Sequence, residues 1–134
     1  SIVAHYRTAA AVRSVLDEVP AVRNLRARHM VGMGGVLSSA SRMHALLHPE
    51  ETPRLLPADA LPQMIAMFGS GRPLTEADTA VLLRAAPDRL HNIVPGMIIA
   101  SVLAETFAAA DIRYSDSGVR EGYIWKEIIG AEQR

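Results

Sequence analysis

The chain has 134 residues, enough for one domain with a buried core, and 49% of its residues are apolar. Its 14 basic and 14 acidic residues cancel and aromatic residues make up 4%, so the composition favours neither a nucleic-acid partner nor an anionic membrane. Cysteine is absent, which excludes disulfides and thiolate chemistry. The longest apolar stretch is too short to span a bilayer and no segment resembles a secretory signal, so we expect a cytoplasmic protein.

The chain opens with a helical pattern that ends before Pro20. Ser1 stands where an initiator methionine would, and Ile2 already belongs to the pattern, so we expect a chain trimmed from a longer protein. A short helical extension is predicted over residues 22–26. The apolar face of the first helix follows i, i+3, i+4, i+7 spacing and comprises Val12, Val15, Leu16 and Val19.

A short strand is predicted over residues 28–31, and the glycine-rich segment 32–35 then forms a turn. The next helix ends before Pro49, and the segment 48–57, which holds three prolines, indicates a loop. The inner face of this helix is expected to comprise Leu37, Ala40, Met43 and Leu47.

Two helices are predicted in the middle of the chain. Asp59 is placed to cap the first of them, which ends within residues 69–73. Thr75, with Asp78 three residues later, is a variant of the capping box and opens a helix that reaches about Ala86. The inner face of the first helix comprises Leu61, Met64, Ile65 and Phe68.

The last third predicts an almost wholly buried helix over residues 92–110, a strand over 111–115 and a final helix over 119–129. In total the pattern predicts a helix-rich α/β fold with about six helices and two strands. Because a long helical crossover joins the strands, they are expected to pair in parallel. A parallel pair normally belongs to a larger sheet, so we expect an incomplete sheet here.

Each predicted strand leads into a turn whose residues are suited to anion binding. The glycines of 32–35 would let backbone N–H groups at a helix start approach a phosphate, although a tight turn that needs positive φ explains them equally. The second turn holds Ser115, Asp116 and Gly118, which either cap the final helix or face a ligand. The carboxyl ends of parallel strands form the usual ligand crevice, so both turns are expected at one edge of the sheet.

Charged residues beside these turns have two interpretations each. Arg89, next to Asp88, either pairs or caps at a helix start or contacts a phosphate chain. Arg120 and Glu121 fall in the first turn of the final helix, where an ion pair competes with phosphate binding.

Two histidines stand four residues apart on one predicted helix. The spacing of His44 and His48 lets two imidazoles share a metal ion. No third ligand is evident from the sequence, so two histidines at the solvent edge are the simpler interpretation and no metal site is assigned.

Three segments together resemble one enzyme family. Residues 30–40 resemble its strand, glycine loop and helix, and residues 89–96 resemble its Arg…Ile-x-x-Gly helix start. Residues 112–124 match its closing signature, a strand ending in Ser-Asp followed by Gly-x-Arg-Glu-Gly. The family is that of the exopolyphosphatases and guanosine pentaphosphate phosphohydrolases, and the resemblance spans nearly the whole chain.

The resemblance implies an actin-like, ribonuclease H-like fold, with residues 1–134 as the later part of the second actin-like domain. It implies hydrolysis of terminal phosphate from inorganic polyphosphate or guanosine pentaphosphate with Mg²⁺. It also implies a missing N-terminal domain as partner, and a homodimer is a further possibility. The phosphate-binding residues carried over are Gly32, Gly34, Gly35, Arg89, Ser115 and Arg120. Those carried over as structural at the start of the final helix are Asp116, Gly118, Glu121 and Gly122.

The chain also departs from the family pattern. The family's Asp-x-Gly-Gly-Gly-Ser loop and its catalytic Glu are absent, so no catalytic residue and no Mg²⁺ ligand is expected here and the chain is expected to be inactive alone. Val36 stands where the family has Thr, and Ser38 where a cation is common, which predicts weaker phosphate contact. The alternatives are a non-catalytic interaction module that pairs through an exposed sheet edge, or another doubly wound nucleotide-binding domain.

Overall fold

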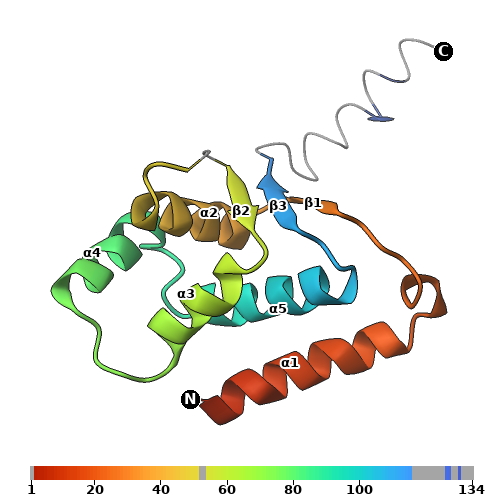
Figure 1. Ribbon diagram of the computed structural model, residues 1–134, viewed down its shortest axis with the longest axis horizontal. Coiled ribbons are helices and arrows are strands. Elements are labelled where there is room, and N and C mark those ends of the chain that lie inside the picture. The colour runs from red at the N-terminus through yellow and green to blue at the C-terminus, as the bar shows by residue number, and fades with distance from the viewer. Residues whose placement is uncertain (1, 52–53, 116–125, 128–129, 131–134) are drawn as a thin grey trace.

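The computed structural model describes residues 2–51, 54–115, 126–127 and 130 (Figure 1). The described part confirms the helix-rich α/β class, with five α-helices and a three-stranded mixed sheet. None of the described helices is both long and apolar enough to cross a membrane. The predicted final helix falls almost wholly outside these residues. In chain order the elements are α1 (Ile2–Asp17), the 3-10 turn η1 (Pro20–Val22), β1 (His29–Gly32), α2 (Gly35–Leu47), β2 (Leu55–Pro57), α3 (Ala60–Gly69), α4 (Glu76–Ala85), α5 (Ile93–Thr106) and β3 (Asp111–Tyr114).

The sheet has the strand order β1-β3-β2. β1 and β3 pair in parallel, as predicted, with Gly32 opposite Tyr114. β2 runs antiparallel to β3 and occupies the end of a segment predicted to be a loop, so that prediction was wrong for its last residues. The sequence carries no clear signal for this strand, because it is three residues long and ends in Pro57. Proline is typical of loops, although sheets tolerate it in an edge strand.

The strand register separates a covered face of the sheet from an open one. Ile112 at the centre pairs with Leu56, and both are 2% exposed. The next row along the strands holds Val31, which is 66% exposed, and Arg113, which is also exposed. Because successive residues of a strand point to opposite faces, the first row meets the helices and the second row does not.

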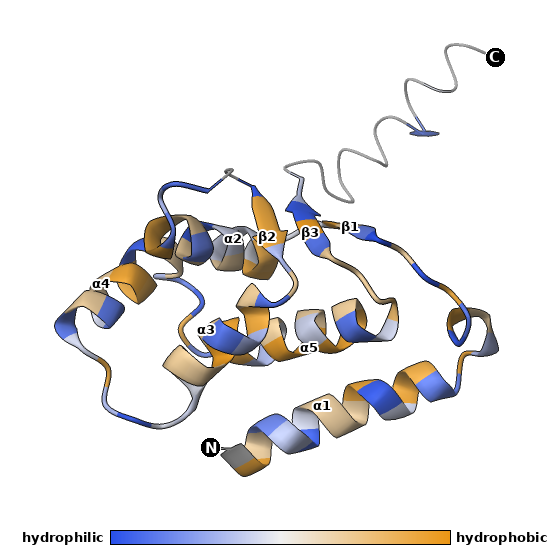
Figure 2. Cartoon of the chain, viewed as in Figure 1, coloured by the Kyte–Doolittle hydropathy of each residue, from blue (hydrophilic) through white to orange (hydrophobic). Residues whose placement is uncertain are grey.

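α5 is the centre of the helical layer and packs against α1, α2 and α3. Apolar residues are denser along α5 than along α1 (Figure 2). Six of the 14 residues of α5 are buried and Pro95, Ile99 and Glu105 are exposed, so the prediction of an almost wholly buried helix holds only in part. The core around α5 comprises Ala40, Met43, Leu56, Ala60, Leu61, Met64, Ala85, Ala86, Ile93, Met97, Ala100, Ala104 and Ile112.

α1 lies along α5 at the margin of the molecule (Figure 1), and its predicted apolar face is only partly covered. Val15 is 63% exposed and Val19 43% exposed, whereas Leu16 is half-buried. Contact with a single neighbouring helix covers a narrow stripe, not a full face. The predicted extension over 22–26 was also misplaced, because the short turn is η1.

α5 ends at Thr106, four residues before the predicted end. Ala108 adopts a left-handed conformation with φ 52°, and the N–H of Ala109 donates to the carbonyl of Ala104 at 2.8 Å. The N–H of Ala108 also donates to Glu105 at 3.2 Å, which completes a Schellman motif. Position 108 holds alanine where glycine is usual, so the sequence carries no signal for the end of the helix.

The predicted helix caps had different outcomes. The Thr75 hydroxyl accepts from the N–H of Asp78 at 3.0 Å, and the Asp78 carboxylate accepts from the N–H of Thr75 at 3.4 Å, so the capping box is confirmed. Asp59 stands at the start of α3 but makes no side-chain cap, because its backbone is already helical. That capping prediction was wrong.

Candidate functional site

The ends of the two parallel strands lie side by side. Beyond the last pair of the register, the N–H of Ser115 donates to the carbonyl of Gly32 at 2.9 Å. The loop after β3 therefore begins beside the glycine loop, at the edge where the carboxyl ends of parallel strands meet. The remaining residues predicted for this loop and helix, Asp116, Gly118, Arg120, Glu121 and Gly122, lie outside the described residues.

Glycine is required at the first two glycine positions of the loop for different physical reasons. Gly32 is buried, and a Cβ built on it would lie 2.5 Å from Cδ1 of Leu37 and 3.0 Å from Cγ2 of Ile112. Gly34 is exposed and has φ 94°, a conformation that favours glycine. Packing thus requires the first glycine, and the chain reversal into α2 requires the second.

The start of α2 offers backbone donors. Gly34 is the N-cap residue and has no side chain, so the helix lacks a side-chain cap. The first helical bond runs from the N–H of Ser38 to the carbonyl of Gly34, at 3.0 Å. The N–H groups before it have no partner within the helix, and the helix dipole adds positive potential there.

Arg89 lies against this helix start. A Cβ built on Gly35 would be 2.0 Å from Nη2 of Arg89 and 2.1 Å from its Cζ, so the guanidinium occupies the space that a side chain would fill. The backbone of Arg89 is held in the loop between α4 and α5, where its carbonyl accepts from the N–H groups of Asn92 and Ile93 at 3.0 and 2.9 Å. Two residues far apart in the sequence, both predicted for the site, therefore meet.

A cavity of about 220 Å³ opens between the start of α2 and the loop after α4. Arg42 of α2 and Arg89 of the loop after α4 both line it, and Asp88 is the one carboxylate among its lining residues. In the described part of the chain, neither guanidinium has a carboxylate within 4.0 Å. The cavity is lined by Gly35, Ser38, Ser39, Arg42, Ala85, Ala86, Pro87, Asp88 and Arg89.

This lining includes residues that the sequence analysis missed. Ser39 and Arg42 follow Gly35 at four and seven positions, which places all three on one face of α2. Helical spacing counted from the glycine loop would have found them. Arg42 supplies a cation, and the serines supply hydroxyls, beside a loop that was expected to lack both.

Val36 points elsewhere. A Cβ built on Gly96 would lie 2.3 Å from Cγ1 of Val36, so this side chain packs onto α5, and it is absent from the cavity lining. Val36 thus fills a contact between α2 and α5. The hydroxyl groups among the cavity's lining residues are those of Ser38 and Ser39.

The charge of the cavity suits an anion and does not suit Mg²⁺. Mg²⁺ takes oxygen ligands in octahedral geometry, whereas this cavity presents two guanidiniums against one carboxylate. Guanidinium groups pair with phosphate oxygens, often through two parallel hydrogen bonds. No step through a magnesium ion is assigned to these residues.

The two histidines of α2 differ from their predicted placement. His44 is 3% exposed, so it is a buried residue and not one at the solvent edge. His48 is half-buried at the end of the helix. Their rings are 4.8 Å apart, measured between centroids.

A second cavity, about 460 Å³, lies between α1, α3 and α5 and contains none of the predicted site residues. Its walls are mainly apolar, and an exposed ion pair between Arg13 and Glu105 (3.0 Å) stands among them. It presents no group of side chains suited to a defined reaction.

No protein-family model matches the sequence, and no curated protein matches it. The fold and the cavity define a helix-rich α/β unit with a cationic pocket at a helix start. An assignment to a family therefore depends on the motifs and on this geometry.

Proposed function

We propose that this chain forms one wall of the phosphate cleft in a cytoplasmic phosphohydrolase of the exopolyphosphatase and guanosine pentaphosphate phosphohydrolase type. The fold would be the later part of an actin-like domain. The observation that carries the proposal is the position of the Arg89 guanidinium over Gly35, at the uncapped start of α2.

The arrangement supports a chain of phosphates as the ligand. Backbone N–H groups at the start of α2 give one set of donors, while Arg42 of the same helix and Arg89 of the loop after α4 give charged donors. Converging donors from separate elements suit a tetrahedral anion with several oxygens. A polyphosphate or a guanosine pentaphosphate would present such groups in series.

The role proposed for this chain is binding and orientation. Arg42 and Arg89 would hold the phosphate chain, and the serine hydroxyls would accept or donate at its oxygens. The Asp-x-Gly-Gly-Gly-Ser loop of the family does not occur in these 134 residues. Metal binding and the activation of water would therefore come from other parts of the intact enzyme, and the chain alone is expected to release no phosphate.

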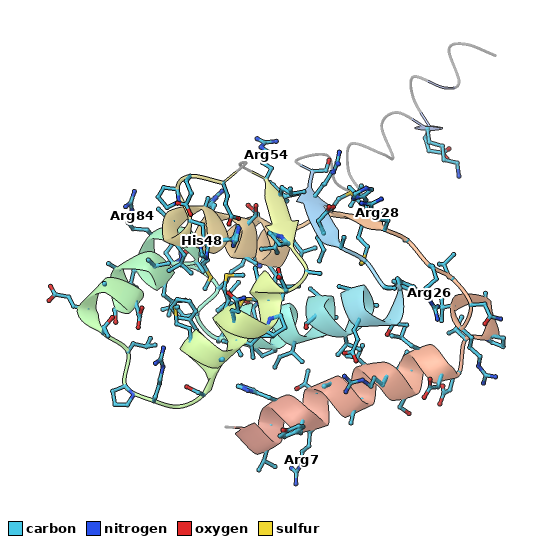
Figure 3. The ribbon with its side chains drawn as sticks, in the orientation of Figure 1. Arg7, Arg26, Arg28, His48, Arg54 and Arg84 are labelled. Carbon is cyan, nitrogen blue, oxygen red and sulfur yellow. The ribbon has the colours of Figure 1, made fainter. Side chains whose placement is uncertain are left out.

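Polyphosphate binding to the 134-residue chain tests the site, with isothermal titration calorimetry as the measurement. Arg89→Ala and Arg42→Ala should each weaken binding about tenfold or more, because each removes a charge-assisted contact of about 1.5–3 kcal/mol. Arg84→Ala is the matched control: Arg84 is exposed, points away from α4 (Figure 3), and is absent from the cavity lining. Wild-type affinity in Arg89→Ala would contradict the proposal.

Phosphate release tests the enzymatic part of the proposal. The full-length encoded protein should release phosphate from polyphosphate or guanosine pentaphosphate with Mg²⁺, whereas the 134-residue chain should not. A full-length protein that releases no phosphate from either substrate would contradict the phosphohydrolase assignment. Preference for a dinucleotide over polyphosphate would instead favour another doubly wound nucleotide-binding domain.

A second candidate function rests on the free edge of β1. In the described part of the sheet β1 pairs on one side only, and Val31 and Met33 are 66% and 51% exposed. An exposed strand edge with apolar residues is a template for pairing with another chain. Light scattering at high concentration tests for a homodimer, which Val31→Lys should then dissociate; a strictly monomeric chain argues against this function.

A further inference from the structure

Four side chains with metal-binding atoms gather at the C-terminal end of α2. His44 and His48 come from its last turn and from the residue after it, and Glu50 and Glu51 follow in the next loop. Figure 3 shows His48 at this end of the helix. The cavity at Gly35 is lined by none of these four residues, so the cluster is a separate site.

Three of these residues already point their donor atoms at one another. One donor atom from each of His48, Glu50 and Glu51 lies within 4.8 Å of the other two. The Nδ1 atom of His48 is 3.8 Å from Oε1 of Glu50, longer than a hydrogen bond. The three side chains are therefore close together, and the contact between His48 and Glu50 is longer than a hydrogen bond.

His44 fixes the position of Glu51. Its Nε2 is 2.6 Å from Oε2 of Glu51, and its side chain is only 4% exposed. The other ring nitrogen, Nδ1, is buried and has no hydrogen-bond partner among the described residues. With Nδ1 unpaired, the ring proton belongs on Nε2, where it donates to the carboxylate. A hydrogen bond of this kind, from a residue that does not itself bind the metal, orients a metal-binding carboxylate.

The space next to the histidines is not filled by packing. A cavity of about 170 Å³ is lined by His44 and His48, together with Gln63, Met64 and Met67. The cavity adjoins the two histidines, whereas Glu50 and Glu51 are not among its lining residues.

We propose that His48, Glu50 and Glu51 bind one divalent transition-metal ion of the Zn²⁺ type, with His44 as a positioning residue. One imidazole nitrogen and two carboxylate oxygens match the ligands of zinc, whereas Mg²⁺ prefers oxygen alone. Bond lengths of about 2.0–2.2 Å require the donor atoms to approach to about 3.3–3.6 Å. The side chains of His48 and Glu50, which His44 does not hold, can make that movement toward Glu51.

The test uses the tag-free chain and Zn²⁺ titration by calorimetry, with Co²⁺ absorption as a second readout. Wild type should bind one ion per chain. His48→Ala should weaken binding about 100-fold or more, since it removes the nitrogen ligand, and Glu50→Gln at an exposed position should also weaken it. Loss of a residue that orients a ligand lowers metal affinity about 10–100-fold. His44→Gln should therefore weaken binding by that factor while the Co²⁺ spectrum keeps its band positions.

His29→Ala is the matched control. His29 has Nδ1 at 2.9 Å from both oxygens of Asp111, so it represents a surface histidine beside a single carboxylate. This variant should bind Zn²⁺ as the wild type does. Circular dichroism confirms that each variant is folded, and a rise in melting temperature with Zn²⁺ should appear in wild type and not in His48→Ala. Absence of Zn²⁺ binding by wild type, or unchanged affinity in His48→Ala, would overturn the proposal.

Discussion

The Nη2 atom of Arg89 lies 2.0 Å from the position that a Cβ atom of Gly35 would occupy. The side chain of Arg89, from the loop between α4 and α5, therefore fills space at the start of α2 that a glycine leaves free. This contact joins the two residues on which the proposed phosphate site depends, and it makes glycine at position 35 a requirement of the site and not of the fold.

Gly35→Ala should weaken polyphosphate binding while leaving the stability of the fold nearly unchanged. The added methyl group must displace Arg89, but only the far end of a flexible side chain has to move, and alanine is the better helix former. The free energy of unfolding should therefore change by less than about 1 kcal/mol, while polyphosphate affinity falls toward that of Arg89→Ala. Urea denaturation and calorimetry measure the two quantities. If Gly35→Ala binds polyphosphate as tightly as wild type, the contact has no role in binding.

Gly96→Ala should destabilise the packing of α2 on α5. Its Cβ would lie 2.3 Å from Cγ1 of Val36, a branched side chain with little freedom to move. Overpacking of this kind costs about 1–3 kcal/mol in the free energy of unfolding, which a lower urea midpoint at unchanged slope would report. Adding Val36→Ala should restore part of the loss, and a purely additive double variant would contradict the contact.

Ala108→Gly should stabilise the chain. Ala108 has φ 52° at the end of α5, where glycine adopts this conformation without strain. We expect a gain of about 0.5–1 kcal/mol in the free energy of unfolding, measured by urea or thermal denaturation. Ala109→Gly, at the next position, is the control and should give no gain. A loss of stability in Ala108→Gly would show that the helix does not end as described.

Thr75→Ala should destabilise α4 and loosen the loop that carries Arg89. It removes the side chain that caps the N–H of Asp78 at 3.0 Å, a change that costs about 1 kcal/mol. Thr75→Ser keeps the hydroxyl and should stay close to wild type. Hydrogen exchange of the α4 amides measures the local effect, and equal protection in both variants would argue against the capping box.

The local elements were predictable where short-range chemistry decides them. The Thr75 and Asp78 capping box opens α4 as expected. The inner faces predicted for α2 and α3 contribute Ala40, Met43, Leu61 and Met64 to the core. β2 and the end of α5 were not predictable, because a three-residue strand needs β3 as its partner and Ala108 gives no local signal for a left-handed turn.

The candidate site, like the fold, was predictable from the sequence only in part. By itself the sequence determined the α/β class, the parallel strand pair and the glycine loop, since periodicity and glycine conformation are local properties of the chain. Tertiary structure alone decided that Arg89 meets Gly35, that Arg42 faces the same cavity and that His44 is buried against Glu51. Those contacts join segments up to 54 residues apart, and only the packing of α4 and α5 on α2, driven by apolar burial, brings the first of them together.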